Sequence, residues 1–170
     1  VIVFQGHALE VFPSLRTSTK HLIADIYDPM HLEQLEQARH LPTEQWERQV
    51  GDASAAIEAQ LSLADYFLCA SQRQRHFYLG QLTTLGRVNP SAYADDPHLD
   101  RLIGVVPFGM PDDDPVHGTA ALRGVVEGIG PDDALMVWSG GIYDWFDPLT
   151  LIHAVAKLAQ SRPTVRLFFM

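Results

Sequence analysis

The chain has 170 residues, of which 46% are hydrophobic and 19% charged, and its formal net charge is -9. This composition is typical of a globular protein with room for one ordinary domain or two small ones, and it excludes disorder along the whole chain. Lysine occurs only at Lys20 and Lys157, and the basic residues form no run. Because phosphate neutralisation needs clustered basic side chains, we expect no nucleic-acid partner.

Short apolar runs predict buried parallel strands, and the amphipathic stretches between them predict helices. In chain order, strands are expected at residues 1–4, 21–26, 66–70 and 102–106, within PDDALMVW (131–138), and at 165–170. Helices are expected from Pro29, behind an N-cap at Thr43, behind Ser71 with Gln74 as its capping-box partner, and behind Asp147 with Pro148 in the first turn.

This alternation predicts an α/β protein with Rossmann-like parallel sheets covered by helices. The acidic, proline-bearing stretch PDDDPVHG, residues 111–118, is expected to link a unit at 1–110 to a unit at 119–170. Its three aspartates are interpreted as solvated turn residues. Both ends of the chain, VIVFQG and VRLFFM, look like strands, which is typical of a piece of a longer protein.

No apolar run approaches the roughly 18 residues of a membrane span, so no such span is expected. No secretory signal precedes the first apolar segment, and we therefore expect a cytoplasmic location. The single cysteine, Cys69, lies in the apolar run YFLCA and is expected in the core.

Ligands of parallel α/β sheets bind at the carboxyl ends of the strands, and unusual residues follow several strands here. In DIYDP, Asp25 and Asp28 flank Tyr27, and either carboxylate could act as a base or bind an acceptor hydroxyl. Alternatively, Asp25 caps a neighbouring backbone and Asp28 caps the helix after Pro29. His7, in QGHALE, could bind a sugar hydroxyl or a phosphate, and a loop histidine without a ligand explains it equally well.

The stretch LMVWSGGIYDWFDPLTLI, residues 135–152, combines two glycines, two acids and three aromatics in one connection. Gly140 and Gly141 would let the backbone approach a ligand, and the helix start behind them offers free amides to a diphosphate. Asp144 and Asp147 would repel phosphate unless they point elsewhere, and capping alone explains Asp147.

The alternative for this stretch is a structural loop that Trp145 and Phe146 anchor in the core. No GxGxxG or GxxxxGK[ST] motif occurs, which disfavours dinucleotide oxidoreductases and P-loop enzymes. The eight histidines show no HxxxH or HExxH spacing, so we expect no metal site.

Three stretches occur in an order that resembles the retaining glycosyltransferases of the GT-B type, in the group-1 or family-four class. They are ADYFLCASQRQRHFYLG (64–80), VVPFGMP (105–111) and GGIYDWFDPLTLIHA (140–154). The resemblance covers nearly the whole chain, and GGIYDWFDP is its most specific part. It implies a GT-B two-domain architecture with both domains incomplete: the end of an acceptor-side domain and the start of a nucleotide-sugar domain.

The resemblance further implies transfer of a sugar from a nucleoside-diphosphate sugar to a glycan or lipid-linked acceptor, without cofactor or obligatory metal. The site residues that it implies are Gly140, Gly141 and Asp144 for the donor, Asp28 and Tyr27 for catalysis, and His7 and Asp25 for the acceptor. Tyr27 departs from the histidine that is common at its position. Segments that hold phosphate and sugar in such enzymes are absent, so the chain alone is expected to be inactive, and the full-length protein to contact a membrane only peripherally.

Two alternatives stay open. A nucleotide-sugar epimerase shares the two-domain architecture, and it would need carboxylates and histidines such as Asp28 and His7 to converge on the sugar beside the Gly140 loop. A non-catalytic α/β interaction module would have side chains filling the space at Gly140.

Overall fold

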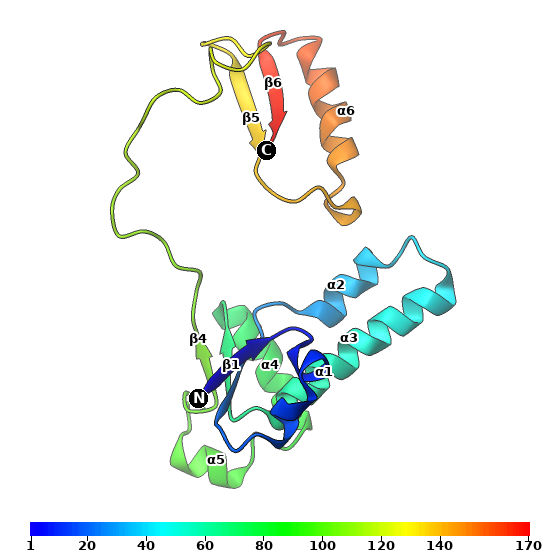
Figure 1. Ribbon diagram of the computed structural model, residues 1–170, viewed down its shortest axis with the longest axis vertical. Coiled ribbons are helices and arrows are strands. Elements are labelled where there is room, and N and C mark those ends of the chain that lie inside the picture. The colour runs from blue at the N-terminus through cyan, green and yellow to red at the C-terminus, as the bar shows by residue number, and fades with distance from the viewer. The chain divides into compact units, whose positions relative to one another are not determined.

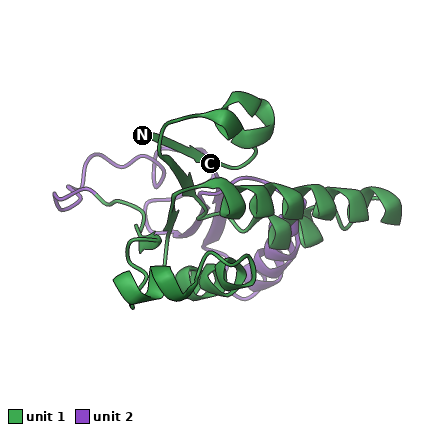
Figure 2. Ribbon diagram, turned by 90° about the horizontal axis from the view of Figure 1, so that it is seen from below, with its two compact units in different colours: residues 1–110 green, residues 111–170 purple.

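The computed structural model describes residues 1–170, and the chain divides into two compact units, Val1–Met110 and Pro111–Met170 (Figures 1 and 2). Both units combine parallel strands with helices, which confirms the predicted α/β class. None of the helices combines the length and the apolar composition that crossing a membrane requires.

The sheet of the first unit has parallel strands in chain order. They are β1 (Ile2–Gln5), β2 (Leu22–Asp25), β3 (Tyr66–Cys69) and β4 (Ile103–Val105). All of them are confirmed within one residue of the predicted ranges. The register places Gln5 opposite Asp25, and Asp25 opposite Leu68, so the carboxyl ends of β1 and β2 lie side by side.

The helices of this unit are α1 (Ala8–Val11), α2 (Met30–Gln37), α3 (Thr43–Leu63), α4 (Gln72–Thr84) and α5 (Pro90–Asp95), with a 3₁₀ turn η1 at Pro13–Thr17. The predicted N-cap at Thr43 is wrong, because Pro42 takes the N-cap position and Thr43 is already helical. Neither α1 nor α5 was predicted. The start of α5 is nevertheless well marked, since the side chain of Asn89 accepts a hydrogen bond from the backbone N–H of Ala92 at 3.0 Å.

Alternate strand residues form the core together with α3 and α4. The fully or nearly fully buried members include Phe4, Ala24, Phe67, Cys69 and Ile103 from the strands and Ile57, Leu61, Tyr78 and Leu82 from the helices. Cys69 is thus a core residue, as predicted. Parallel strands in chain order with right-handed crossovers place successive helices on one face. The other face is less well covered, since its Val3 is 60% exposed.

The second unit is one βαβ element. Its strands β5 (Ala134–Trp138) and β6 (Val165–Phe169) pair in parallel, and α6 (Pro148–Ala159) connects them after a 3₁₀ turn η2 (Asp144–Phe146). The predicted N-cap of α6 is confirmed, because Asp147 Oδ1 accepts a hydrogen bond from the N–H of Thr150 at 3.1 Å.

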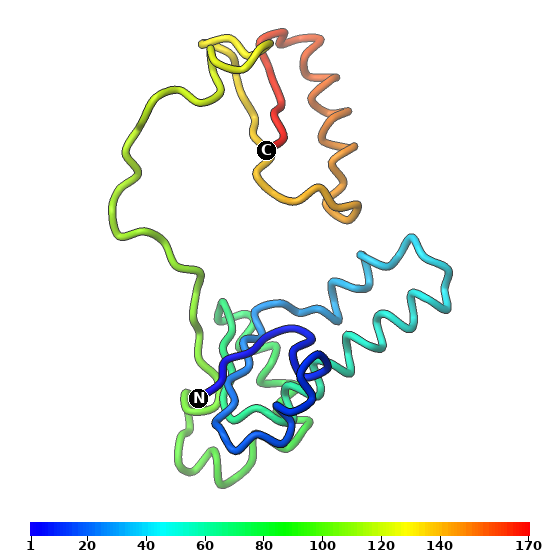
Figure 3. Tube along the Cα trace, in the orientation of Figure 1, coloured from blue at the N-terminus to red at the C-terminus, as the bar shows by residue number.

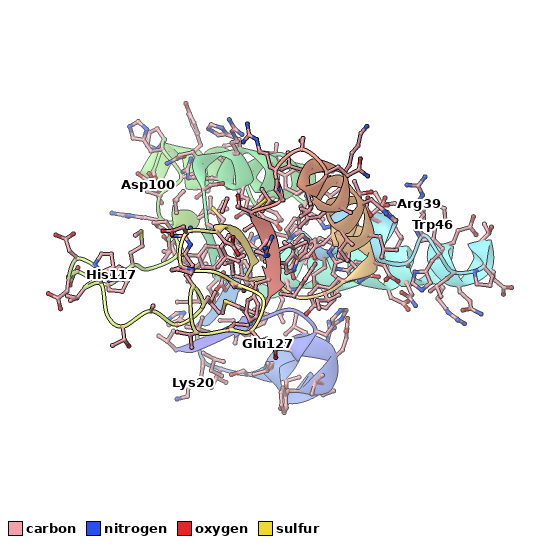
Figure 4. All side chains as sticks on the ribbon, turned by 90° about the horizontal axis from the view of Figure 1, so that it is seen from above. Lys20, Arg39, Trp46, Asp100, His117 and Glu127 are labelled. Atoms are coloured by element: carbon pink, nitrogen blue, oxygen red, sulfur yellow. The ribbon has the colours of Figure 1, made fainter.

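The segment predicted as a linker, residues 111–118, contains no helix or strand, and all of its residues are exposed. The chain trace in Figure 3 runs through it between β4 and β5, and Figure 4 labels its His117. Asp112, Asp113 and Asp114 are exposed within this segment.

Candidate functional site

A cavity of about 60 Å³ lies at the carboxyl ends of β1 and β2. Gly6 lines it after β1, residues Asp25–Asp28 line it at the end of β2, and Ile57 and Gln60 line it from α3. Three of the residues singled out from the sequence, Asp25, Tyr27 and Asp28, therefore surround one cavity. This is the edge at which parallel α/β sheets bind ligands.

His7 does not join these three residues. It lies at the start of α1, where its Nδ1 is 2.5 Å from Oε2 of Glu10, and it lines a different pocket with Gln34 and Asp52. Both members of the His7–Glu10 pair are exposed. His7 and Asp28 thus line two different pockets of this unit.

Gln74 holds the loop that carries Tyr27 and Asp28. Its Nε2 donates to the carbonyl of Tyr27 at 2.6 Å, while its Oε1 accepts from the N–H of Ala70 at 2.8 Å. Ser71 Oγ in turn accepts from the N–H of Gln74 at 3.3 Å, so the predicted cap of α4 forms. The sequence identified Gln74 only as a capping residue, and its bond to Tyr27 spans 47 positions.

Asp28 does not cap α2, so that alternative is wrong. The N-cap of α2 is Pro29, no side chain caps the helix, and Asp28 Oδ1 is buried without a hydrogen-bond partner. The Asp28 carboxyl lies beside the carboxyl of Glu33 in the first turn of α2. Burial, followed by the charge of Asp28 and a hydrogen bond with it, raises the pKa of Glu33. The Glu33 carboxyl therefore keeps its proton to a higher pH than an exposed glutamate does.

Two further buried polar groups lie on α4 and α2, and only the first of them, Tyr78, feels the charge of Asp28. The hydroxyl of Tyr78 is buried without a partner, and burial together with the charge of Asp28 raises the Tyr78 pKa far above its ordinary value. His31 has a buried Nδ1 without a partner, and burial lowers its pKa. Its ring stacks on Phe77 at 5.6 Å. Tyr78 and His31 are therefore both neutral at neutral pH.

The sequence analysis missed Glu33, Gln60 and Tyr78. All three lie inside helices, where helical spacing marks them only as members of a face. Only Glu33 could have been identified from the sequence. It lies in the first helical turn after Asp28, where the two carboxyls can come close.

Glu33→Gln is expected to stabilise the fold at neutral pH. A raised carboxyl pKa means that the folded chain binds more protons than the unfolded chain above the ordinary value of 4.5, so stability falls as the pH rises through that window. Because Glu33→Gln removes the ionisable group, the stability of this variant should not fall in that pH range. Urea unfolding at several pH values measures the pH dependence of the free energy of unfolding, with Glu44→Gln, an exposed substitution on α3, as the control. Parallel pH profiles for Glu33→Gln and the parent chain would contradict the assignment.

In the second unit, Gly141 serves the packing of its own loop. A Cβ at this position would overlap the ring of Tyr143, and the Gly141 carbonyl accepts a hydrogen bond from Trp138 Nε1 at 3.1 Å. At Gly140, a Cβ would meet only Trp138 Nε1, at an ordinary 3.8 Å. The space beside Gly140 is therefore open, and Gly140 is where a ligand could approach the backbone.

The aromatic residues of this loop stack on one another. The rings of Tyr143 and Trp145 lie 4.5 Å apart and almost parallel, and Phe146 meets Tyr143 edge-on at 5.6 Å. Tyr143 and Phe146 are each 49% exposed. The interpretation of Trp145 and Phe146 as core anchors is therefore wrong, because Trp145 is only half-buried, Phe146 is exposed, and both pack within a cluster of aromatic rings in the loop.

The two acids of the loop differ in their surroundings. Asp147 caps α6, and hydrogen bonds from Thr150 lower its pKa, so it stays ionised at the helix N-terminus. An anion at that terminus would have to tolerate this charge. Asp144 is exposed in η2 and has no hydrogen bond to the helix that follows.

No three side chains of the His, Cys, Asp and Glu types are grouped so that they could hold a metal ion. In comparisons with known proteins, no family model, no curated protein and no solved structure matches the chain. A function for the chain rests on its motifs and on the geometry at its strand ends.

Proposed function

We propose that the chain is part of a GT-B type glycosyltransferase, which moves a sugar from a nucleoside-diphosphate sugar to a bacterial cell-envelope glycan or glycolipid. The proposal rests on the positions in the fold of the three stretches that resemble these glycosyltransferases. ADYFLCASQRQRHFYLG covers β3 and α4, VVPFGMP leaves the end of β4, and GGIYDWFDPLTLIHA forms the loop after β5 and most of α6. Each is a strand-to-loop connection at a carboxyl end, which is where such folds bind ligands.

The order of the strands in the first unit supports the same assignment. Doubly wound sheets bind ligands outside the carboxyl ends of their strands, and each half of such a sheet runs in one direction from the centre. The sheet β1–β2–β3–β4 runs in one direction, and its first two strands end at the cavity with Asp25, Tyr27 and Asp28. We assign this edge to the acceptor, with Asp28 as the group that accepts its hydroxyl proton or hydrogen bond.

The donor is assigned to the loop after β5. Negative charge develops on the leaving diphosphate, and backbone N–H groups stabilise such charge when they can approach it closely. Gly140 has an open side, and the Tyr143 ring over Gly141 holds the loop in shape. Asp144, which would repel phosphate, is assigned to the hydroxyls of the donor sugar.

The two alternative functions, an epimerase and an interaction module, have less support. An epimerase would draw on histidines beside the carboxylates, and His7 lies in a different pocket from Asp28. An interaction module would fill the space at Gly140, which is open. The separation of His7 also removes it from our acceptor site.

The test is binding of UDP, GDP and dTDP to this chain and to a chain extended past Met170, monitored by ligand-observed NMR. One of these nucleotides is expected to bind the extended chain only, and Gly140→Trp in that chain is expected to weaken binding at least about tenfold, because the indole occupies the approach to the backbone. Gly118→Trp, in the exposed segment, is the matched control and should bind like the parent chain. Equal binding by Gly140→Trp and the parent chain would contradict the donor assignment.

A further inference from the structure

We propose that one face of α3 forms a groove that binds a helix of a partner protein, and that this helix is amphipathic with basic side chains beside its apolar face. Such binding is separate from the transfer reaction and does not depend on it. The groove consists of two hollows that lie in succession along α3. Figure 1 shows α2 and α3, which pack on each other and carry the first of them.

One side of α3 lines both hollows. The first has a volume of about 410 Å³, and Leu35 of α2 completes it. The second has a volume of about 300 Å³, and residues of α2 and α4 complete it. From α3, the lining residues are Thr43, Trp46, Glu47, Val50 and Gly51 in the first hollow and Ser54, Ile57, Glu58 and Leu61 in the second. Their spacing of three or four positions places them on one helical face, which corresponds to about 27 Å of helix from end to end.

The wall that faces α3 continues from α2 to α4. His31 of α2 and Gln81 of α4 both line the second hollow, and their Nε2 atoms are 3.5 Å apart. Leu35 lies one helical turn after His31, so the same side of α2 serves both hollows. The apolar side chains along the groove are Leu35, Trp46, Val50, Ile57, Leu61 and Leu85. An elongated apolar groove accepts the apolar face of a helix, whereas a small molecule would fill only one of the hollows.

Gly51 keeps the middle of the groove open. Glycine weakens the interior of a helix relative to alanine. A Cβ at Gly51 would meet no other part of the chain within 4 Å, so packing inside the protein does not require glycine here. Ser54, the next residue of this face, is also small and exposed. Because the distance between packed helices depends on the side chains at their contact, these two residues allow a second helix to approach α3 closely.

Acidic side chains lie at the edge of the groove. Glu47 lines the first hollow and Glu58 the second, and both are exposed. No lysine or arginine lines either hollow. Arg39, which Figure 4 labels together with Trp46, already pairs with Glu36 at 3.2 Å. Arg48 is the one basic residue of α3, and it lies about 100° around the helix from Glu47.

These charges favour a basic partner helix over the other possible occupants. Lysine or arginine beside the apolar face of the partner would complement Glu47 and Glu58. A second copy of this chain has a formal net charge of -9 and would bring acids onto acids. An anionic lipid surface would be repelled for the same reason.

A synthetic peptide of about 18 residues, with leucines on one helical face and lysines on the other, probes the groove. In NMR titrations of the isotope-labelled full chain, this peptide is expected to shift the backbone amides of Gly51 and Ser54. Replacing its lysines by glutamate, or its leucines by alanine, is expected to weaken binding at least about tenfold. Absence of these shifts would overturn the proposal, and so would equal binding by either replaced peptide.

A variant that fills the hollow locates the site. Gly51→Phe is expected to weaken binding of the leucine–lysine peptide at least about tenfold, because the ring occupies the middle of the groove. The variant should fold, since phenylalanine is tolerated better than glycine inside a helix. Gln45→Phe adds the same ring at an exposed position of α3 that lines neither hollow, and it should bind like the parent chain. Equal binding by Gly51→Phe and the parent chain would overturn the proposal.

Two double variants test the charges at the edge. Glu47→Gln with Glu58→Gln is expected to weaken binding about fivefold, as the loss of two exposed ion pairs implies. Asp52→Asn with Asp95→Asn removes the same charge at exposed positions outside both hollows, and it should have a smaller effect. Equal weakening by the two double variants would reduce the attraction to net charge and overturn the proposal.

The other occupants are tested with the chain alone. Sedimentation is expected to show no self-association through the groove, and phosphatidylcholine vesicles are expected not to bind. A dimer, or vesicle binding, that Gly51→Phe abolishes would assign the groove to a second copy or to a lipid surface. Either result would overturn the proposal.

Discussion

Arg87→Ala is expected to lower the free energy of unfolding of the first unit by about 3 kcal/mol. The guanidinium of Arg87 donates to three carbonyls at the end of α3: Leu61 at 2.8 Å, Ser62 at 3.0 Å and Ala64 at 2.7 Å. The last carbonyls of a helix have no partner inside it. One side chain therefore satisfies acceptors that alanine would leave partly buried and unpaired.

Hydrogen exchange of the β3 amides measures this loss in the first unit alone. An effect of this size corresponds to exchange that is faster by about two orders of magnitude. Arg87→Lys should restore only part of the protection, since a single ammonium cannot reproduce the planar fork. Arg73→Ala, an exposed substitution on α4, should change little. Equal protection in Arg87→Ala and Arg73→Ala would contradict the role of Arg87.

Phe67→Ala is expected to cost about 3–5 kcal/mol. Phe67 is 0% exposed on β3, which pairs with both β2 and β4, so the truncation leaves a cavity at the middle of the sheet. Arg87 Cζ lies 5.5 Å from the centre of its ring, which adds a cation–π contact of about 1 kcal/mol.

Urea unfolding of Phe67→Ala, Arg87→Ala and the double variant measures both terms. The double variant should lose less than the sum of the single losses, by roughly the cation–π contribution. Phe12→Ala is the matched control, because Phe12 is 59% exposed and its loss should cost less than about 0.5 kcal/mol. A loss in Phe67→Ala as small as that in the control would contradict the packing described above.

The strands and the cap of α6 could be predicted because local sequence determines them. Continuous apolar runs of four or five residues mark strands buried in a parallel sheet, and Asp147-Pro148 carries both signals of a helix start. The four-residue helix α1 is too short to show a helical period. At Thr43, the preceding proline took the N-cap position instead, which the preference of threonine for that position does not reveal.

The candidate site could be predicted only as far as strand ends determine it. Asp25, Tyr27 and Asp28 meet at one cavity because they follow one strand. His7 follows the neighbouring strand, and its local pairing with Glu10 in α1 takes it to another pocket. Gln60 lies 54 residues from the Gly6 carbonyl that it binds. Such a contact depends on how α3 packs against α1 and β2, which no local pattern encodes.

The loop after β5 contains two adjacent glycines with different roles. Gly140 and Gly141 were both candidates for ligand contact, but the ring of Tyr143 packs over Gly141 and stacks on Trp145. Gly140 keeps an open side within the same loop. The sequence contained both glycines, but only the position of the Tyr143 ring separates their roles.

Isotope-labelled NMR with UDP, GDP and dTDP tests the central claim most directly. On a chain extended past Met170, we expect one of the three nucleotides to shift the backbone amides of Gly140, Gly141 and Asp144, while the amides around Asp28 stay in place. A folded extended chain in which none of the three nucleotides moves these amides would contradict the assignment to a glycosyltransferase.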